Sequence, residues 1–236
     1  MLSCSDDEAH CLNKSDLSPN LLRVFGGVKI ALASLSALVP MELFLLCILG
    51  YLIGSIPTGY LLMKYAAGKD IRELGSHSTG ATNVLRSGNK TLALLTLLGD
   101  ALKGIFFTLT LKLFCDDPFW LVAVFCCTIG HAYPIWLAFK GGKGVATSAG
   151  IFLVIAPAYA ALSILVWAVL AKFLKISSVA SLALSISFAA LCTYGFIFGQ
   201  TNLNVFLFSL ASLVFLIFTH CENIRRIMHQ DEQKVG

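Results

Sequence analysis

Charged residues are scarce in this chain: Asp, Glu, Lys and Arg make up 13% of its 236 residues, whereas 57% are hydrophobic. Soluble domains carry roughly 25% charged residues, so the composition excludes an ordinary soluble fold and predicts an integral membrane protein. The net charge of +4 is small, and the sequence has neither a basic tail nor basic residues interleaved with aromatic ones. These absences exclude a nucleic-acid-binding protein.

Metal-binding patterns are missing as well. The eight cysteines and five histidines form no CxxC motif and show no Cys/His ligand spacing. We therefore expect neither a metal nor a cofactor. Cys47, Cys126, Cys127 and Cys192 lie inside apolar runs, which indicates inert, buried thiols rather than disulfides.

Long apolar segments predict an all-helical, polytopic membrane protein. A helix of ~20 residues spans the ~30 Å hydrocarbon core. We predict such spans at residues 43–63, 92–114, 119–139, 178–198 and 205–219. An acidic turn at 116–118 separates the second span from the third. The uncharged segment 144–171 contains Pro157 and would be about 42 Å long as one helix.

The basic residues indicate how many times segment 144–171 crosses the membrane. They lie before and after it, whereas the opposite loops hold Asp116 and Asp117 or no charge. Because cytoplasmic loops are enriched in Lys and Arg, both basic groups belong in the cytoplasm, and 144–171 crosses an even number of times. We expect two short helices hinged near Pro157, or a re-entrant pair. This gives about seven transmembrane helices, some short or broken, with the polar loops and the C-terminus inside. The basic residues are Lys64, Lys69, Arg72, Arg86, Lys90, Lys140 and Lys143, then Lys172, Lys175, Arg225 and Arg226.

The first 40 residues differ from the rest. Residues 1–20 are polar and weakly acidic, and 21–39 are apolar but contain Arg23 and Lys29. This pattern fits a signal-like segment, an amphipathic helix, or sequence upstream of a true start at Met41. We favour a dispensable extension at 1–40, followed by a single membrane domain at 41–236.

The loop after the first span, DIRELGSHSTGATNVLR at 70–86, is rich in small and hydroxylated residues. Glycines let backbone N–H groups approach a phosphate, hydroxyls donate to it, and Arg supplies a forked cation. A merely solvated loop has no reason to concentrate such residues, so we predict a phosphate-binding loop. Its candidate residues are Arg72, Gly75, Ser76, Gly80, Thr82, Asn83 and Arg86.

A second phosphate-binding segment is FKGGKGVATS at 139–148. Gly141, Gly142, Lys143 and Gly144 precede a predicted helix, where a flexible backbone, the positive helix end and an ammonium favour an anion. The GxxxxGK[ST] spacing and a preceding strand are missing, which excludes a P-loop.

Charged residues also occur inside the predicted spans. Asp100 and Lys103 lie three residues apart and therefore share one helix face. Intramembrane charges usually face a partner or a cavity, so a structural pair and a substrate-facing pair, with Lys103 as the ligand, both remain open. His131 by itself indicates a histidine used in helix packing, and the glycine and proline of GSIPTG at 54–59 predict a loosened helix.

Polar residues gather at the ends of the last two spans. Ser177, Ser178 and Ser181 begin one of them, where helix capping explains them adequately. Because they lie on the side of the phosphate loops, Ser177 and Ser178 are also candidate phosphate-binding residues. His220 and Asn223 follow the last span and lie three apart, so on a helix they point the same way.

Together these motifs resemble the bacterial acyl-phosphate-dependent glycerol-3-phosphate acyltransferases, membrane enzymes of phospholipid synthesis. The resemblance covers roughly residues 41–232 and includes GSIPTGY, DIRELGSHSTGATNVLR, GDALKG, GHAYPIWLAFKGGKGVATS and HCENIRRI, in that order. The chain departs from the pattern where GSGN is replaced by GSHS at 75–78, and where Gln230 replaces a glycine.

The resemblance implies acyl transfer from acyl phosphate to the 1-hydroxyl of glycerol 3-phosphate, giving 1-acylglycerol 3-phosphate and inorganic phosphate. It implies catalytic roles for Arg72, Ser76, His220 and Asn223, a role for Glu232, and glycerol 3-phosphate binding at 141–144. It also implies a multi-pass protein of the bacterial inner membrane, with its site facing the cytoplasm, supplied by a soluble enzyme that makes acyl phosphate.

An acyl phosphate is a reactive mixed anhydride, so no covalent protein nucleophile is needed. The site has to align the reactants and hold two phosphates against their mutual repulsion. His220 is a candidate general base, and the acyl phosphate's own oxygens are the alternative. The chain has no HxxxxD motif, unlike acyltransferases that use that pair with thioester donors. A transporter of phosphorylated solutes is the rival function, but the motifs gather on one side, without a detectable internal repeat.

Overall fold

The computed structural model of the protein describes residues 41–115 and 119–234. The described residues are helical, with no strand among them. The expectations for residues 1–40 and for the acidic turn at 116–118 lie outside the described residues. The elements are α2 (Met41–Gly54), α3 (Thr58–Ala67), η2 (Ile71–Glu73), α4 (Ala81–Arg86), α5 (Lys90–Phe114), α6 (Trp120–Ala132), η3 (Ile135–Leu137), α7 (Val145–Ile155), α8 (Pro157–Leu174), α9 (Ser177–Ile197), α10 (Leu203–Thr219) and α11 (Cys221–Met228).

Five of the described segments are long and apolar enough to cross a membrane: Met41–Ala67, α5, Trp120–Leu137, α8 and α9. A sixth is the pair α10 and α11, which bends by 60°. α7 is apolar but has only 11 residues and would be about 16 Å long. The described residues thus hold five or six candidate spans, fewer than the seven expected, because α7 is too short to cross alone. The all-helical membrane fold is confirmed.

Two helix breaks lie where the sequence predicts them. α7 ends at Ile155 and α8 begins with Pro157 at its first position, because proline lacks the N–H that an uninterrupted helix needs but fits a first turn. α2 ends at Gly54 and α3 begins at Thr58, so the GSIPTG segment breaks the first span. The hinge near Pro157 is confirmed.

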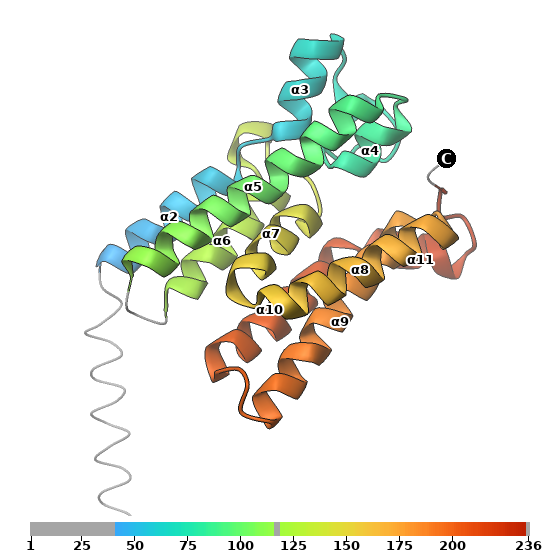
Figure 1. Cartoon of the computed structure of the whole chain (residues 1–236). Coiled ribbons are helices and arrows are strands. Elements are labelled where there is room, and N and C mark those ends of the chain that lie inside the picture. Colours follow the sequence, from blue (N-terminus) through green and yellow to red (C-terminus); the bar gives the residue numbers. More distant parts are fainter. Residues whose placement is uncertain (1–40, 116–118, 235–236) are drawn as a thin grey trace, which may run out of the picture. The chain divides into compact units, whose positions relative to one another are not determined.

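Close helix pairs rest on glycines. A Cβ on Gly104 would overlap the carbonyl oxygen of Thr147, and a Cβ on Gly150 would overlap that of Ala101, so α5 and α7 pack backbone to backbone. Such small-residue contacts are typical of helices in membranes, where tight packing replaces the hydrophobic effect. Figure 1 shows α7 beside α5, and α8, α9 and α10 side by side.

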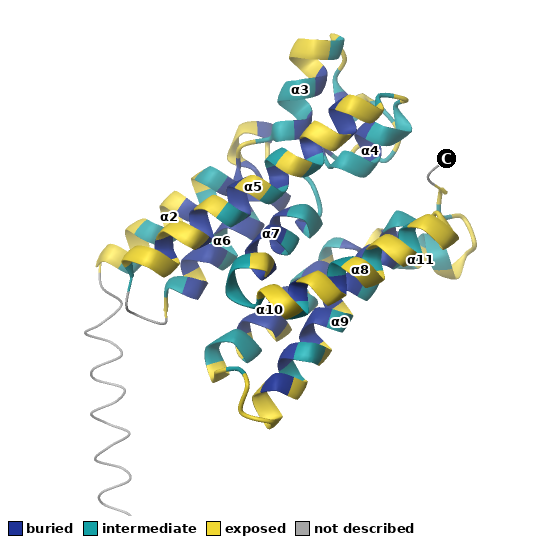
Figure 2. Ribbon diagram, viewed as in Figure 1, coloured by how far each residue is buried: buried dark blue, intermediate teal, exposed yellow. Residues whose placement is uncertain are grey.

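The core lies between these helices. Phe152 of α7 stacks on Phe188 of α9 with ring centroids 3.8 Å apart, and both rings are buried. Large apolar side chains also remain exposed on α5 and α8, among them Phe106 and Leu165. Figure 2 shows exposed residues along the outer sides of α2, α5 and α8. This surface suits contact with lipid.

Candidate active site

One cavity of about 370 Å³ lies between α4, α5, α7, α8, α9 and α11. Its polar lining residues come from five separate parts of the sequence. They are Ser76, Ser78, Thr82, Asn83, Arg86, Asp100, His131, Lys143, Ser177, Ser178, Ser181, His220, Asn223 and Glu232. Its other walls are apolar and include Leu97, Leu98, Leu153, Ile164, Trp167 and Leu184. A single cavity therefore joins a polar end to a hydrocarbon-like one.

The structure brings most of the predicted site residues to this cavity. From the catalytic set these are Ser76, His220 and Asn223. From the binding set they are Gly80, Thr82, Asn83, Arg86, Lys143, Ser177 and Ser178. The described residues that line the cavity do not include Arg72, Gly75, Lys103, Gly141, Gly142 or Gly144.

Asn83 organises the 70–86 loop rather than offering its side chain to a ligand. Its amide nitrogen donates to the carbonyl oxygens of Ile71, Leu74 and Ser78 at 2.8–3.1 Å. Its side-chain oxygen accepts from the backbone N–H of Ser76 at 2.9 Å. The side chain is buried, so its hydrogen-bonding capacity is spent on the loop. Asn83 thereby holds Ser76 at the edge of the cavity.

The start of α9 contacts α4. The hydroxyls of Ser177 and Thr82 lie 2.8 Å apart, and the Ser181 hydroxyl donates to the Ser177 carbonyl at 2.8 Å. In the described structure α9 has Ile176 at its N-cap and no side-chain cap. The capping explanation for these serines is therefore wrong: their hydroxyls line the cavity instead.

A hydrogen-bonded chain crosses the polar end. The ammonium of Lys143 donates to the side-chain oxygen of Asn223, whose amide nitrogen donates to Glu232 at 2.6 Å. Glu232 also accepts from the Ser178 hydroxyl at 2.9 Å and pairs with Arg226 at 2.7 Å. Although burial opposes it, the hydrogen bonds from Arg226, Asn223 and Ser178 hold the pKa of Glu232 below its ordinary value.

Burial and neighbouring positive charges destabilise the charged form of Lys143. Burial lowers its pKa to about 8, against the attraction of Glu232, and the charges of Arg226 and Arg86 lower it further. Three cations thus gather around the Glu232 carboxylate, and Glu222 adds a smaller attraction. Since like charges destabilise one another, the polar end of the cavity favours an anionic ligand.

Arg86 lies at the end of α4 and is half-buried. Its Nη2 atom donates to the Gln233 carbonyl at 2.7 Å, while its buried Nε atom has no partner among residues 41–115 and 119–234. An arginine with an unused donor at an anion-favouring cavity is suited to phosphate.

The orientation of His220 is set by the last turn of α10. Its Nδ1 atom lies 2.7 Å from the Leu216 carbonyl oxygen, so Nδ1 carries the proton and donates. A neutral imidazole then has an acceptor at Nε2. His220 is buried and lines the cavity, which makes Nε2 available to accept a proton.

Gly141, Gly142 and Gly144 shape the second loop without lining the cavity. Gly141 and Gly142 donate their backbone N–H groups to the carbonyls of Ala132 and His131, each at 3.1 Å. Gly144 has a φ of 85° at the start of α7, a left-handed conformation that favours glycine. These glycines hold the backbone so that Lys143 faces the cavity.

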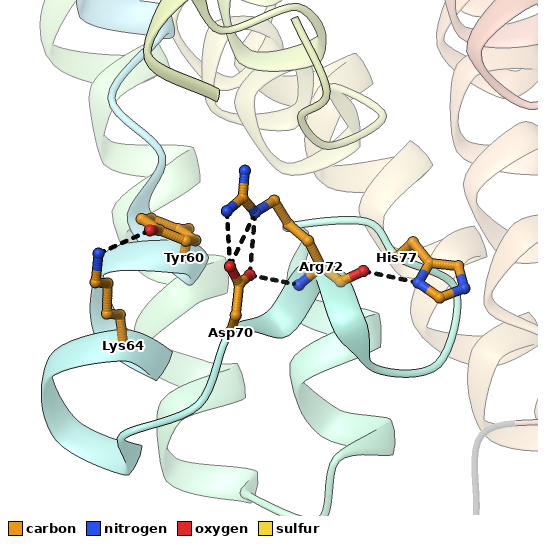
Figure 3. A network of polar contacts seen from close by, with 5 residues as sticks. All are labelled: Tyr60, Lys64, Asp70, Arg72 and His77. Atoms are coloured by element: carbon orange, nitrogen blue, oxygen red, sulfur yellow. Dashed lines mark hydrogen bonds and ion pairs between the residues drawn. The ribbon is translucent and has the colours of Figure 1, made fainter. Parts of the chain in front are cut away.

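Arg72 lies elsewhere. Figure 3 shows its guanidinium facing Asp70, with Nε–Oδ1 and Nη2–Oδ2 distances of 3.0 and 2.7 Å. It also lies over the ring of Tyr60, 4.9 Å from the centroid, and lines a separate cleft with Trp136. Hydrogen bonding to Arg72 lowers the pKa of Asp70. This position gives no support to the expected role of Arg72 as a phosphate ligand, because its fork is occupied by Asp70. Gly75, φ 54°, serves the turn between Arg72 and Ser76.

Lys103 is buried below the cavity. Its ammonium contacts Asp100 and His131, each at 2.9 Å. Lys103 therefore has the structural role, one of the two alternatives left open for the Asp100 and Lys103 pair. Asp100 and His131, in contrast, also line the cavity.

Some lining residues had weak or no sequence signals. Glu232 was implied only by resemblance, and its ion-pair partner Arg226, which does not itself line the cavity, was noted only among the basic residues that set the orientation. The terminal segment reaches Glu232 through Gln230, which has a φ of 60°, so the expected glycine and Gln230 serve the same left-handed turn. Trp167 and Ile164 lie in an ordinary apolar run, where only the tertiary structure distinguishes lining residues from lipid-facing ones.

Comparisons with known proteins agree with this architecture. The family model described as glycerol-3-phosphate acyltransferase matches residues 44–230. A glycerol-3-phosphate acyltransferase of Hyphomonas neptunium is 43% identical over 194 residues, covering 81% of this chain and 92% of the relative. One of Agrobacterium fabrum is 42% identical over 198 residues, covering 84% and 94%.

Solved structures of PlsY (YgiH), an integral membrane glycerol 3-phosphate acyltransferase, are also similar. The glycerol 3-phosphate form has a TM-score of 0.74 at 34% identity, covering 82% of this chain and 95% of that one. The lysophosphatidic acid form has a TM-score of 0.72 at 33% identity with the same coverage. Matched along nearly all of its described length, this chain belongs to the glycerol-3-phosphate acyltransferase family of integral membrane enzymes.

Proposed function

We propose that this protein transfers a fatty acyl group from acyl phosphate to the 1-hydroxyl of sn-glycerol 3-phosphate. The products are 1-acylglycerol 3-phosphate, a lysophosphatidic acid, and inorganic phosphate. The observation that carries this proposal is the single cavity that joins cationic residues to apolar walls. Both reactants have a phosphate, and one of them has a long hydrocarbon chain, so such a cavity suits the pair.

The phosphates bind at the cationic end. Arg86 and Lys143 supply positive charge, and Ser76, Thr82, Ser177 and Ser178 supply hydroxyls beside them. We assign the arginine role to Arg86 in preference to Arg72, because Arg86 lines the cavity while Asp70 occupies the fork of Arg72. Binding of phosphate dianions relieves the repulsion between the buried cations.

The reaction needs no covalent protein intermediate. The glycerol oxygen forms an ester bond with the acyl carbon, and the bond between that carbon and the phosphate oxygen breaks. Phosphate leaves with the electron pair. The hydroxyl proton passes either to Nε2 of His220 or to a phosphate oxygen of the donor. Alignment of hydroxyl and carbonyl supplies most of the acceleration.

The apolar walls hold the acyl chain. Leu97, Leu98, Leu153, Ile164 and Leu184 extend the cavity away from the phosphate end. Burial of a methylene group stabilises by about 0.8 kcal/mol, so the chain contributes strongly to donor binding. The donor thus arrives with its tail among the helices and its phosphate beside Arg86, while Lys143 holds the phosphate of glycerol 3-phosphate.

The proposed setting is the inner membrane of a bacterium, with the site facing the cytoplasm. The positive-inside rule supports this orientation, because the basic segments at 64–90 and 140–143 contain the cavity residues Arg86 and Lys143. Residues 41–236 form the acyltransferase domain. A soluble enzyme that produces acyl phosphate is the expected supplier of the donor, and neither a metal nor a cofactor is needed.

The test is acyl transfer by the purified full chain in detergent. Labelled glycerol 3-phosphate and a long-chain acyl phosphate are expected to yield labelled lysolipid, whereas a long-chain acyl thioester is not. Lys143→Ala should lose most activity, while the matched variant Lys140→Ala, which changes an exposed lysine three residues away, should keep it. No lysolipid from the wild-type chain would refute the proposal.

A further inference from the structure

Three ionisable side chains lie together below the phosphate loops, inside the membrane segments. Asp100, Lys103 and His131 are each at least nine-tenths buried. The Lys103 ammonium lies 2.9 Å from Asp100 Oδ1 and 2.9 Å from His131 Nδ1. Ionisable groups at membrane depth are costly and usually functional, yet Lys103 does not reach the cavity among its described lining residues.

Lys103 links three segments of the chain. Its third hydrogen bond, at 3.0 Å, goes to the carbonyl of Ile56 in the break between α2 and α3. An ammonium has three donors, and here each has an acceptor. Lys103 therefore joins the broken first span, its own helix α5 and the end of α6.

His131 connects Lys103 to residues 141–144, here called the glycine loop. Its carbonyl accepts from the N–H of Gly142 at 3.1 Å. Its ring lies so close to Gly142 that a Cβ there would overlap the ring's Nε2. The ring orientation is in turn set by Lys103 and Asp100, because Nδ1 accepts from the ammonium and also lies 3.4 Å from Asp100 Oδ1. Gly142 thus rests against a histidine that Lys103 holds in place.

Lys143 follows Gly142 directly. Its backbone carbonyl accepts from the Thr219 hydroxyl at 3.0 Å, and its ammonium donates to Asn223. A displacement of Gly142 would move this ammonium relative to Asn223.

We propose that Asp100, Lys103 and His131 form a positioning triad. The triad fixes the position of the glycine loop and so places the Lys143 ammonium for binding glycerol 3-phosphate. The inference rests on the proposed function, because it assigns the triad to the binding of that acceptor. Lys103 acts through His131 and Gly142 and does not touch the substrate.

Kinetics of Lys103→Met test the triad. We expect the KM for glycerol 3-phosphate to rise about tenfold or more, since small misplacements of binding groups have large effects, while the KM for acyl phosphate changes less than about twofold. The matched control is Thr108→Val, which removes a buried hydroxyl of α5 that bonds only to the Gly104 carbonyl among the described residues. Unchanged KM for glycerol 3-phosphate in Lys103→Met, or an equal rise in both KM values, would overturn the proposal.

A second experiment does not depend on Lys103→Met folding. Gly142→Ala should raise the KM for glycerol 3-phosphate, because the new methyl group meets the His131 ring. His131→Ala should also raise it, but Gly142→Ala added to His131→Ala should change it by less than about twofold, since the obstructing ring is gone and neighbouring sites couple. Multiplicative effects of the two changes would overturn the triad.

Different results would refute the proposed function and the positioning triad. If the wild-type chain makes no lysolipid, the proposed function fails. If the wild-type chain makes lysolipid while the variants keep their KM for glycerol 3-phosphate, only the triad fails.

Discussion

The ammonium of Lys143 donates a hydrogen bond to the side-chain oxygen of Asn223, 80 residues later in the chain. Asn223 in turn donates to Glu232 at 2.6 Å. The glycine loop, α11 and the C-terminal segment therefore meet the cavity as one connected unit. Changes at any of these residues should alter binding of the anionic acceptor.

Alkaline pH should weaken binding of glycerol 3-phosphate. Burial lowers the pKa of Lys143 to about 8, so its charge is present below pH 8 and is lost as the pH rises through that value. We expect the KM for glycerol 3-phosphate to rise toward about tenfold per pH unit above pH 8, measured in steady-state assays. Lys143→Arg keeps its charge and should flatten this rise. The same slope in both proteins would contradict the role of Lys143.

Glu232→Gln should shift that pH dependence. Attraction to Glu232 raises the pKa of Lys143 against the effect of burial, so removing the carboxylate charge should lower it. The rise in KM would then begin at a lower pH than in the wild type. Loss of the bonds to a charged group, typically about 1.5–3 kcal/mol each, should also raise KM at pH 7. An unshifted profile would show that Glu232 does not act on Lys143.

Arg86→Lys and Arg72→Lys should differ strongly. Lysine keeps the charge but lacks the planar fork. At Arg86, which lines the cavity, we expect kcat/KM to fall about 100-fold, the equivalent of about 2.7 kcal/mol. At Arg72, paired with Asp70, we expect a loss of less than about tenfold. Kinetics of both purified variants decide this, and a larger loss at Arg72 would restore the original expectation.

Asn83→Asp should disorder the 70–86 loop while keeping the side chain's shape. A carboxylate still accepts from Ser76 but cannot donate to the carbonyls of Ile71, Leu74 and Ser78. Leaving buried acceptors unpaired costs about 1–3 kcal/mol each. We expect faster proteolysis within 70–86 and a low kcat/KM. Wild-type proteolysis rates would contradict this structural role.

Gln230→Gly should stabilise the turn before Glu232. Gln230 has a φ of 60°, and a left-handed conformation costs a residue with a side chain about 1–2 kcal/mol. Glycine's greater unfolded-state freedom offsets part of the gain, so we expect a modest rise in thermal stability in detergent. β-branched Gln230→Val should lower it. Equal melting temperatures for the three proteins would exclude strain at this turn.

Much of the fold follows from the sequence, because a hydrocarbon core imposes length and composition on every crossing segment. The spans near 178–198 and 205–219 correspond to α9 (Ser177–Ile197) and α10 (Leu203–Thr219). The break at Pro157 was also readable, because proline ends a helix for local reasons. Glycines and hydroxyls in 70–86 likewise pointed to phosphate by their chemistry alone.

What the sequence could not decide was which of several equivalent side chains reaches the cavity. Arg72 and Arg86 lie in the same loop, and either suits a phosphate; the ion pair with Asp70 and the position of Arg86 at the end of α4 separate them. Composition and helical spacing report what a segment can do locally. The direction of a side chain depends on contacts made with residues distant in the chain, and only the folded arrangement of the helices determines those.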